Sequence, residues 1–491
     1  MTITLSDLAA VLPQAEVRGE AELSDATHDS LQAGPGTLFC AIVGQVADGH
    51  DHAEQAVAHG ASALLVERWL DIDVPQLRVS DSRAATGPAA AAIHDHPSMA
   101  LTVVGITGTN GKTTTAYLVE GAFAAAGQGT GLIGTVETRI HGRAQPGVRT
   151  TPEGPDVQRL FAAMRDRGVE GVAMEVSSHG LELHRTDGTH FAVVVFTNLS
   201  QDHLDFHPDM EAYFAAKARL FTEEFADRAV VVVDDDWGKR LATMQGIDTI
   251  TVGRSGDADV RIDTVRTALD GGRADLVGEA VGGSVSISTQ LVGDFNVVNA
   301  ATAVVTAVRA GVPMAAAVDG VAACPGAPGR LERVAGDDGL TVLVDYAHTP
   351  DAVERVVATL RPLVTSGRII VVLGAGGDRD RAKRPLMGAA AARADVAVLT
   401  SDNPRSEDPQ AILDAVTAGA RQAGTAAEIV VEIDRQRAID LALDRAMPGD
   451  VVVIAGKGHE TYQELATGRV DFDDRRIAAD LLADRPKAVD R

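Results

Sequence analysis

The chain has 491 residues, enough for about three domains at one to two hundred residues each. Hydrophobic residues make up 45% of it and charged residues 23%, which is typical of a folded, water-soluble protein. Aromatic residues are scarce (11 Phe, 4 Tyr and 2 Trp), and the formal net charge is −25. Both features count against nucleic-acid partners, which need stacking rings or a basic surface. Small anionic ligands stay compatible with this charge, because backbone N–H groups, a lysine and metal ions can hold phosphates.

The cysteine content and the N-terminus predict where the protein works. Cys40 and Cys324 are the only cysteines and lie far apart in the sequence, which excludes a disulfide framework or a zinc cluster and indicates a reducing compartment. The first residues lack the basic and apolar regions of a signal peptide, and no apolar run approaches the roughly 18 residues of a membrane span. We therefore expect a soluble cytoplasmic protein without a membrane partner, and a monomer by default.

Short β-rich runs alternate with alanine-rich helical stretches along the whole chain. This pattern predicts an α/β fold in which parallel sheets are covered by helices. In the first stretch, strands are expected at Leu38–Ile42 and Ala63–Val66, with a helix around His52–His59 between them. The stretch ends near His96–Ser98, so the first domain is predicted to span residues 1–98.

Two further stretches complete the predicted organisation. The second, residues 99–328, contains a glycine-rich, alternating segment at 255–292 that indicates a small antiparallel patch. Its expected regular elements are a helix at Lys112–Ala126 and strands at Leu101–Ile106, Val172–Val176, Ala192–Thr197 and Ala229–Val233. The third, residues 329–491, has expected strands at Thr341–Val344, Arg368–Leu373, Val396–Thr400 and Val451–Ala455.

The segment Gly105–Thr113 has the composition and the position of a phosphate-binding loop. It follows a strand and opens a helix, so its backbone N–H groups and the positive end of the helix can face an anion. Lys112 can neutralise phosphate charge, and the Thr113 hydroxyl can bind Mg²⁺. The usual spacing requires Gly at position 106, where Ile stands, so the loop is a variant. By itself it predicts only that a nucleoside triphosphate binds.

The loop and seven further motifs together resemble the Mur ligase family, which joins amino acids to a growing nucleotide-linked cell-wall peptide. In chain order the matching segments are Thr107–Thr114, Thr150–Pro152, Glu175–His179, Phe196–Asp205, Leu291–Asn299, Gly329–Arg330, Asp345–Pro350 and Gly456–Glu460. The resemblance covers nearly the whole chain. It implies an N-terminal nucleotide-sugar domain (1–98), a central P-loop ATPase-type domain (99–328) and a C-terminal Rossmann-like domain (329–491) that binds the incoming amino acid.

The family reaction transfers the γ-phosphate of ATP to a substrate carboxylate, and an amine then attacks the acyl phosphate. Holding two anions together calls for cations and metal ions. By resemblance, Lys112, Glu175, His203 and Lys217 are the catalytic residues. Thr113 and Glu175 would bind one Mg²⁺, and His203 the second. Lys217 would be carbamylated, becoming an anion that supports the second metal ion.

The resemblance also implies the residues that bind the nucleotide substrates. Those for ATP are Gly108, Thr109, Asn110, Gly111, Lys112, Thr113, Thr114, Asn296, Arg330, Asp345 and His348. Contacts to ATP from the third domain would require the domains to close around it. Those for the UDP-N-acetylmuramoyl dipeptide are Ser30, Gln45, Val46, Ala47, Thr150, Thr151, Ser177 and Arg185.

The segment Asp402–Arg405 indicates which amino acid is added. It resembles the signature of ligases that add meso-2,6-diaminopimelate to UDP-N-acetylmuramoyl-L-alanyl-D-glutamate. That amino acid carries a second carboxylate, which an arginine can hold bidentately, whereas lysine would leave the arginine unpaired. The implied diaminopimelate-binding residues are Arg379, Asp402, Asn403, Pro404, Arg405, Gly456 and Glu460.

The sequence fits several alternative interpretations less well. His203 and His207 are spaced as in a zinc protease, but Leu204 stands where the catalytic glutamate would be required, and His207 is expected to be structural or exposed. Gly374–Arg379 lacks the third glycine of a dinucleotide-binding motif. A folate-type polyglutamate ligase would share the phosphate loop but not the first domain. A nucleotide-dependent switch would not need the acid, histidine and lysine of a metal site.

Overall fold

The computed structural model describes residues 2–44, 47–147, 149–244, 246–334 and 340–485. The chain divides into two compact units, which are described separately. Unit 1 comprises Met1–Thr264, Ala274–Ile287 and Val298–Cys324, and unit 2 comprises Val265–Arg273, Ser288–Val297 and Pro325–Arg491. In the described residues, three mixed or parallel sheets and two short two-stranded ones are combined with helices. The predicted α/β class is confirmed, whereas the bounds 1–98, 99–328 and 329–491 stay predictions.

The N-terminal part of unit 1 is a five-stranded sheet in the order β2-β7-β6-β5-β4. Strands β4 to β7 are parallel, and β2 pairs with β7 in the antiparallel direction. The sheet strands are β2 (Glu16–Arg18), β4 (Asp25–Thr27), β5 (Thr37–Cys40), β6 (Ala63–Val66) and β7 (Gln76–Arg78). The helices are α1 (Leu5–Val11), α2 (Ala53–Ala58) and α3 (Ser82–Ile93), and β1 (Ile3–Thr4) pairs with β3 (Glu22–Leu23). Apolar side chains of the strands pack on both faces, so each face carries its own core.

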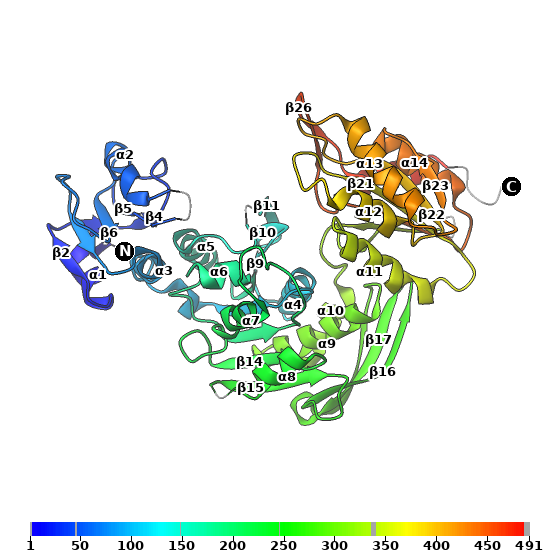
Figure 1. Cartoon of the computed structure of the whole chain (residues 1–491). Coiled ribbons are helices and arrows are strands. Elements are labelled where there is room, and N and C mark those ends of the chain that lie inside the picture. The colour runs from blue at the N-terminus through cyan, green and yellow to red at the C-terminus, as the bar shows by residue number, and fades with distance from the viewer. Residues whose placement is uncertain (1, 45–46, 148, 245, 335–339, 486–491) are drawn as a thin grey trace. The chain divides into compact units, whose positions relative to one another are not determined.

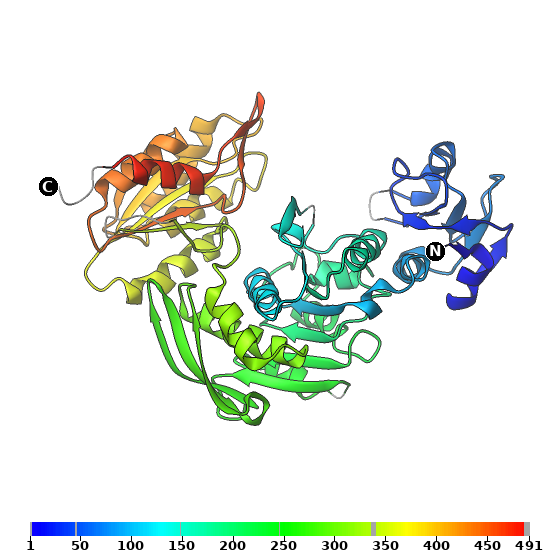
Figure 2. The same cartoon turned by 180° about the vertical axis from the view of Figure 1, so that it is seen from behind.

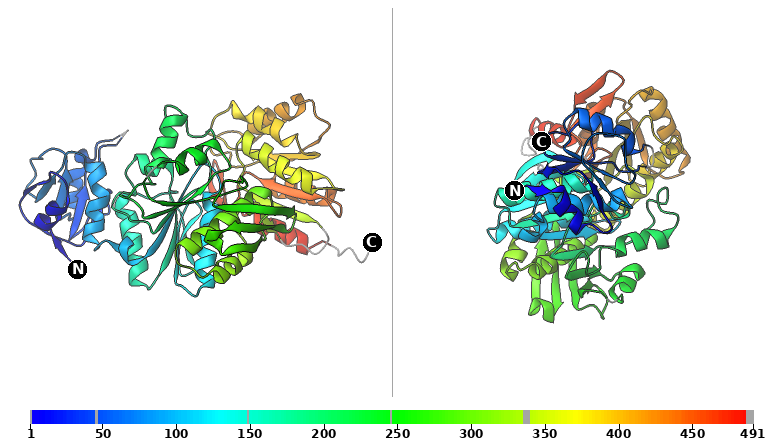
Figure 3. Two further views of the ribbon diagram at one scale, coloured as in Figure 1. Left: turned by 90° about the horizontal axis from the view of Figure 1, so that it is seen from below. Right: turned by 90° about the vertical axis from the view of Figure 1, so that its left-hand side faces the viewer.

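Helix α3 fixes this sheet to the rest of unit 1, as Figure 3 shows. It packs against α5 (Gly154–Asp166). The guanidinium of Arg159 on α5 donates to both carboxylate oxygens of Asp25 at 3.2 Å, and Arg165 donates to the His94 carbonyl at 2.9 Å. At Gly87 on α3, a Cβ atom would lie 2.2 Å from the Asp187 carbonyl oxygen, so only glycine allows the observed approach.

The central sheet has eleven strands among the described residues, in the order β11-β10-β9-β12-β8-β13-β14-β15-β16-β17-β18. Strands β9, β12, β8, β13, β14, β15 and β16 are mutually parallel, while β10 and β11 form an antiparallel edge. The strands are β8 (Thr102–Thr107), β9 (Thr130–Ile133), β10 (Glu137–Ile140), β11 (Arg143–Pro146), β12 (Gly171–Glu175), β13 (Val193–Phe196), β14 (Arg228–Val232), β15 (Asp248–Gly253), β16 (Val260–Ala268), β17 (Gly271–Gly278) and β18 (Gly283–Thr289).

Helices cover the central sheet because its strands are apolar on both faces. One face packs against α5, α6 (Ser178–Glu182), α7 (Met210–Ala218) and α8 (Asp236–Ala242), with Phe161, Phe196 and Tyr213 in the shared core. Helices α4 (Lys112–Ala125) and α10 (Met314–Ala323) pack against each other where Gly121 meets Gly320. Helix α9 (Asp294–Arg309) precedes α10 (Figure 1).

Unit 2 contains a six-stranded sheet in the order β19-β20-β24-β21-β22-β23. All of its strands are parallel except β19, which pairs with β20 in the antiparallel direction. The strands are β19 (Glu332–Val334), β20 (Thr341–Asp345), β21 (Ile369–Ala375), β22 (Val396–Ser401), β23 (Glu428–Val431) and β24 (Val451–Ala455). A separate hairpin joins β25 (Tyr462–Leu465) to β26 (Gly468–Asp471).

Alternate residues of each strand in unit 2 face opposite helical layers. Val371 and Leu373 belong to the core shared with α11 (Pro350–Leu360), α12 (Lys383–Ala391) and α13 (Pro409–Gln422). Ile370 and Val372 belong to the core shared with α14 (Arg435–Arg445) and α15 (Asp474–Ala483), the latter seen from behind in Figure 2. A strand buried on both faces reads as a continuous apolar run, which is why the sequence located these strands.

Most of the expected elements are present within one or two residues. The strand predicted at Ala63–Val66 is β6 without change, and the predicted helix at Lys112–Ala126 is α4. The segment 255–292 forms β16, β17 and β18, which continue the central sheet instead of standing apart from it. Within the described residues, no helix is both long and apolar enough to cross a membrane.

Candidate functional site

The phosphate loop lies between β8 and α4, at the carboxyl ends of the central strands. Gly108 and Gly111 have φ values of +143° and +86°, conformations that favour glycine. Asn198 braces the loop from the end of β13, because its carbonyl accepts from the Thr109 N–H at 2.9 Å and its side-chain oxygen accepts from the Asn110 N–H at 3.0 Å. At the start of α4, Thr113 is buried and Thr114 is half-buried. The loop is therefore a pre-shaped turn at a helix N-terminus, where anions bind favourably.

Two lysine ammonium groups converge on one carbonyl oxygen of this loop. Lys112 Nζ donates to the carbonyls of Gly108 and Thr109, each at 2.9 Å, and Lys217 Nζ donates to the Gly108 carbonyl, also at 2.9 Å. Lys217, on α7, is 1% exposed. Burial, with the nearby charge of Lys112, lowers the pKa of Lys217 well below its usual value. A depressed pKa favours a neutral amine, the form of lysine that reacts with electrophiles.

Glu175 ends β12, beside β8, and is 1% exposed. Its Oε2 accepts from the Thr113 hydroxyl at 2.9 Å and from the Thr135 hydroxyl at 3.1 Å, and its Oε1 accepts from the Thr135 N–H at 2.8 Å. The sequence prediction that joined Thr113 to Glu175 thus corresponds to a direct hydrogen bond. These oxygen ligands suit Mg²⁺, which binds one or two protein oxygens and completes its shell with phosphates and water.

His203 lies in the segment after β13 with a φ of +53°. Its ring packs edge-on against His179 at 4.8 Å and Tyr213 at 6.0 Å, and burial lowers its pKa. Burial, together with the neighbouring histidines, lowers the pKa of His179 to about 4. His207 is 3% exposed and packs on Tyr213. Among the described residues, no group of three or more His, Cys, Asp or Glu side chains is placed to bind a metal ion.

The candidate residues for the muramoyl dipeptide adjoin this site in unit 1. The Thr150 hydroxyl contacts the Thr135 hydroxyl at 2.9 Å, and the Thr151 hydroxyl donates to the Glu175 carbonyl and contacts the Ser177 hydroxyl, each at 3.1 Å. Arg185 donates to the Thr151 carbonyl at 3.3 Å. The segment before α5 is thereby tied to the end of β12.

Arg185 belongs to a cluster of charges that includes a residue of helix α3. It pairs with Glu153 at 2.8 Å, and Arg149 also pairs with Glu153. Arg83, on α3, lies 3.9 Å from the same carboxylate and donates to the Val43 carbonyl. Three cations around one carboxylate leave a net positive charge, which suits an anionic substrate group.

The two described candidates in the N-terminal part of unit 1 lie in loops and differ in exposure. Ser30 is 8% exposed, and its hydroxyl donates to the Gln55 side chain at 2.8 Å. Ala47 is exposed, and its carbonyl accepts from the Gly44 N–H at 2.9 Å. Gln45 and Val46 lie outside the described residues.

Four ATP candidates belong to unit 2. The Asn296 side chain donates to the Val292 carbonyl at 2.9 Å. Asp345 accepts from the backbone N–H groups of Leu331 at 2.7 Å and Ala347 at 2.8 Å, and burial raises its pKa. The guanidinium of Arg330 lies 5.0 Å above the Tyr346 ring, and the exposed His348 ring packs against the same tyrosine.

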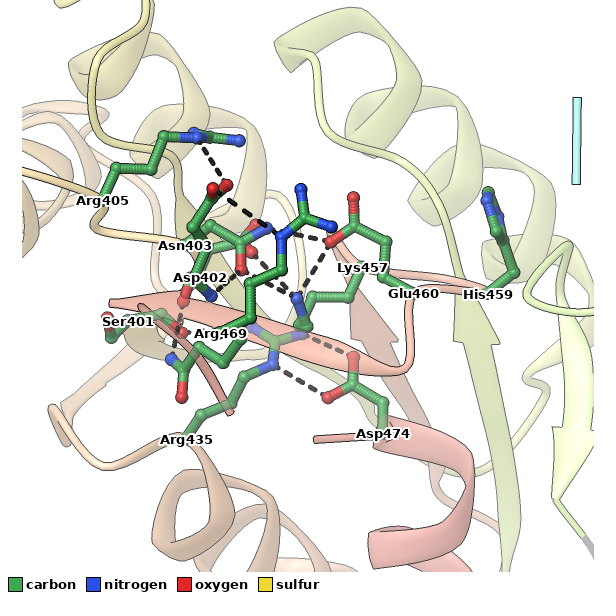
Figure 4. Close-up of polar contacts among 12 residues, drawn as sticks. Ser401, Asp402, Asn403, Arg405, Arg435, Lys457, His459, Glu460, Arg469 and Asp474 are labelled. Atoms are coloured by element: carbon green, nitrogen blue, oxygen red, sulfur yellow. Dashed lines mark hydrogen bonds and ion pairs between the residues drawn. The ribbon is translucent and has the colours of Figure 1, made fainter. Parts of the chain in front are cut away.

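Four of the candidates for the amino acid, Asp402, Asn403, Arg405 and Glu460, follow the carboxyl ends of β22 and β24 in unit 2, as Figure 4 shows. The Asn403 side-chain N–H donates to Glu460 at 2.9 Å, and Gln463 donates to the Asp402 carbonyl at 2.6 Å. A Cβ atom on Gly456, whose φ is +113°, would lie 2.9 Å from the Asp402 carboxylate.

The two arginine candidates differ in their surroundings. Arg405, with a φ of +52°, donates to Glu464 at 3.1 Å and to the Gly377 carbonyl at 2.7 Å. Arg379 is exposed on the loop after β21. A Cβ atom at Gly376 would lie 3.1 Å from Arg405 Nη1 and 3.6 Å from Arg379 Cγ, so both arginines border the same glycine. The Pro404 carbonyl accepts from the Glu407 N–H and so helps to shape the loop.

Three family models match most of the chain. Residues 24–100 match the description "Mur ligase family, catalytic domain", residues 106–307 "Mur ligase middle domain" and residues 329–458 "Mur ligase, glutamate ligase domain". The UDP-N-acetylmuramoyl-L-alanyl-D-glutamate–2,6-diaminopimelate ligase of Streptomyces coelicolor is 48% identical over 488 residues, a match that covers 97% of this chain and 96% of the relative. The chain belongs to the Mur ligase family. The predicted resemblance is thereby confirmed.

Solved structures of related enzymes are similar to this Mur ligase along most of its length. A structure of UDP-N-acetylmuramoyl-L-alanyl-D-glutamate–2,6-diaminopimelate ligase has a TM-score of 0.73 and 33% identity, covering 98% of this chain and 99% of that one. The folylpolyglutamate synthase of Mycobacterium tuberculosis has a TM-score of 0.60 and 21% identity, covering 81% of this chain and 95% of that one. At that identity the second likeness shows a shared fold alone.

Sequence reasoning missed several residues that hold the candidate site of this Mur ligase together. Thr135 makes two hydrogen bonds to Glu175 and stands between β9 and β10, where a single threonine carries no motif. Arg83 and Glu153 complete the arginine cluster from two separate helical segments. Lys457 lies inside the matched segment Gly456–Glu460, so the sequence motif around it is the signal that could have identified it.

Proposed function

We propose that this chain is an ATP-dependent acid–amino-acid ligase. It joins meso-2,6-diaminopimelate to UDP-N-acetylmuramoyl-L-alanyl-D-glutamate through an acyl phosphate, releasing ADP and phosphate during peptidoglycan precursor synthesis. The relatives that match along nearly the whole chain carry the name of this reaction. We further propose that the chain works in the cytoplasm, where ATP and nucleotide sugars are available, and that it works as a monomer.

The observation that carries the choice of amino acid is the charge pattern at the carboxyl ends of β22 and β24. Diaminopimelate has two ammonium groups and two carboxylates. Asp402 and Glu460 supply acids for an ammonium, and Arg405, with Arg379 beside it, supplies guanidinium donors for a carboxylate. We propose that Asn403, Pro404 and Gly456 shape this site. Lysine as a substrate would leave the arginine donors unpaired, which is a costly mismatch.

The phosphate loop is the proposed ATP site in unit 1. Thr113 and Glu175 would hold Mg²⁺, with His203 as the proposed ligand of a second ion. When bound, Mg²⁺ neutralises phosphate charge and so lets the two anionic reactants approach each other. Lys112 supplies a further positive charge from within the loop. Roles in ATP binding for Asn296, Arg330, Asp345 and His348 in unit 2 stay predictions.

Lys217 is the proposed carbamylated residue. Its buried environment disfavours the ammonium form, and a neutral amine can add to CO₂, forming an N–C bond and releasing a proton. The resulting carbamate is an anion near the Lys112 ammonium, which attracts it. We expect Lys217→Ala to lose about 10- to 100-fold in kcat and to regain part of it with short carboxylic acids. Full activity of the unrescued variant would contradict the proposal.

The muramoyl dipeptide is proposed to bind in unit 1. Thr150, Thr151, Ser177 and Arg185 surround the end of β12, next to Glu175. Their hydroxyl and guanidinium donors suit the carboxylates of a D-glutamyl residue. Ser30 and Ala47 are the described candidates in the N-terminal sheet, which is proposed to bind the nucleotide sugar.

The proposal is tested by giving the purified chain UDP-N-acetylmuramoyl-L-alanyl-D-glutamate, ATP and Mg²⁺ with either diaminopimelate or lysine. Mass spectrometry should find a new amide with diaminopimelate and far less product with lysine. Arg405→Ala should weaken diaminopimelate use far more than ATP binding, with the exposed Arg393→Ala as the matched control. ADP release without the dipeptide would indicate a nucleotide switch, and extension of a folate would indicate the other ligase class.

A further inference from the structure

Lysine is rare in this chain, and its placement is informative. Six of the 44 basic residues are lysines and 38 are arginines. Of the five lysines that the structure describes, Lys217 and Lys457 are fully buried, at 1% and 0% exposure. At these two sites a compact ammonium with three donors is enclosed by the protein. Lys217 already belongs to the proposed active site, whereas Lys457 has no role there.

Lys457 lies at the centre of the polar cluster in Figure 4. Its Nζ donates to Glu460 Oε2 at 2.9 Å and to Asn403 Oδ1 at 3.1 Å, and it lies 3.7 Å from Asp402 Oδ1. The same Asn403 donates through its Nδ2 to Glu460 Oε2. The Lys457 ammonium therefore contacts both acids directly, and its hydrogen bond to Asn403 also orients the amide that donates to Glu460.

The three groups Asp402, Glu460 and Lys457 do not balance in charge, because two acids face one ammonium. Around them, Glu464 pairs with Arg405 and Arg469, and Arg435 pairs with Asp474. Asp402 Oδ1 is buried and accepts no hydrogen bond in the described part of the chain. A buried carboxylate oxygen without a hydrogen bond costs free energy unless another group, such as a substrate ammonium, donates to it. Asp402, Glu460 and Lys457 together are one positive charge short, which one substrate ammonium group would supply.

We infer that Lys457 is a positioning residue that holds Asp402 and Glu460 together as a single acidic receptor for the non-reacting ammonium group of the amino acid. The inference rests on the proposed function, because it concerns the same amino-acid site. Lys457 does not touch the substrate in this arrangement. It acts by reducing the repulsion between the two acids and by fixing their orientation through its hydrogen bonds to Glu460 and Asn403 and its ion pair with Asp402.

The test compares diaminopimelate with 2-aminopimelate, which keeps both carboxylates and the reacting amine but lacks the second ammonium. The variant Lys457→Met removes the charge and retains the length of the side chain. The ratio of kcat/KM for diaminopimelate over 2-aminopimelate should fall about tenfold or more, because only diaminopimelate uses the acidic receptor. KM for diaminopimelate should rise while KM for ATP stays unchanged.

Two controls make the result decisive. Lys383→Met, an exposed change at the start of α12, should leave the ratio unchanged. In a Glu460→Gln background, Lys457→Met should lower the ratio little further, since both changes disrupt one receptor. If Lys457→Met fails to fold by circular dichroism, Lys457→Gln, which keeps a donor without the charge, takes its place with the same expectation.

The outcomes separate the inference from the proposed function. An unchanged ratio, or an equal fall for both amino acids, would overturn the positioning role of Lys457 while leaving the ligase intact. Additive losses for Lys457→Met and Glu460→Gln would overturn it as well. If the unmodified chain makes no amide with either amino acid, the proposed function itself fails.

Discussion

The buried ion pair between Arg435 and Asp474 offers the most direct test of what holds the amino-acid end of unit 2 in place. Both side chains are 0% exposed, and two hydrogen bonds join them, Nε to Oδ1 at 2.8 Å and Nη2 to Oδ2 at 2.7 Å. Arg435 also donates to the carbonyls of Ser401 at 3.3 Å and Ala455 at 3.0 Å, the last residues of β22 and β24. The pair therefore connects α14 and α15 to the two strand ends that carry the proposed receptor.

Asp474→Asn keeps the side-chain shape and removes its charge, leaving a guanidinium buried without a counter-ion. Removing one partner of a buried pair costs about 3–5 kcal/mol, and we expect a value near the lower end because two carbonyls still accept from Arg435. At 1.4 kcal/mol for each factor of ten, about 3 kcal/mol corresponds to a hundredfold increase in exchange rate. Hydrogen exchange measured by mass spectrometry should show this increase for the amides of β22 and β24.

The matched control is Asp471→Asn, which removes an exposed carboxylate that pairs with Arg476 at the surface. It should leave exchange in β22 and β24 unchanged. The double change Arg435→Met with Asp474→Leu should cost less than Asp474→Asn alone, since no unpaired charge remains. Exchange within threefold of the unmodified chain in Asp474→Asn would refute the assignment of this pair as the main connection.

Three further predictions concern other parts of the chain. Thr135→Val removes the hydroxyl that donates to Glu175 and contacts Thr150, while the backbone N–H still donates to Glu175, so ATP turnover should fall about tenfold, measured by ADP release, while the melting temperature changes little. Gly456→Ala forces a side chain into a left-handed conformation against the end of β22, and titration calorimetry should show weaker diaminopimelate binding with ADP binding retained. The pKa of Asp48 is raised by burial, but hydrogen bonds from His50 outweigh burial and lower it to about 2, below its unfolded value near 3.9. Asp48 therefore stabilises the fold above about pH 4 and loses this effect as the pH falls through 2, so Asp48→Asn should lower the melting temperature at pH 7 and lower it far less at pH 2.

The sequence by itself determined the fold class and the family. Continuous apolar runs such as Val172–Val176 and Val451–Ala455 located parallel strands, because a strand buried on both faces has apolar residues at every position. The order of eight local motifs identified the Mur ligase family, which the comparisons confirmed. Each of these signals is local, so it can be read within about ten residues of chain.

Tertiary structure alone decided which side chains meet. Lys112 and Lys217 are 105 positions apart, yet they donate to the same Gly108 carbonyl, and the depressed pKa of Lys217 comes from that burial. Arg435 and Asp474 lie on separate helices, and neither belongs to a motif. Such pairs form because the carboxyl ends of parallel strands bring distant loops to one edge of a sheet, an arrangement that depends on strand order. Strand order is set by packing over the whole unit. Local patterns of residues along the chain do not predict that packing.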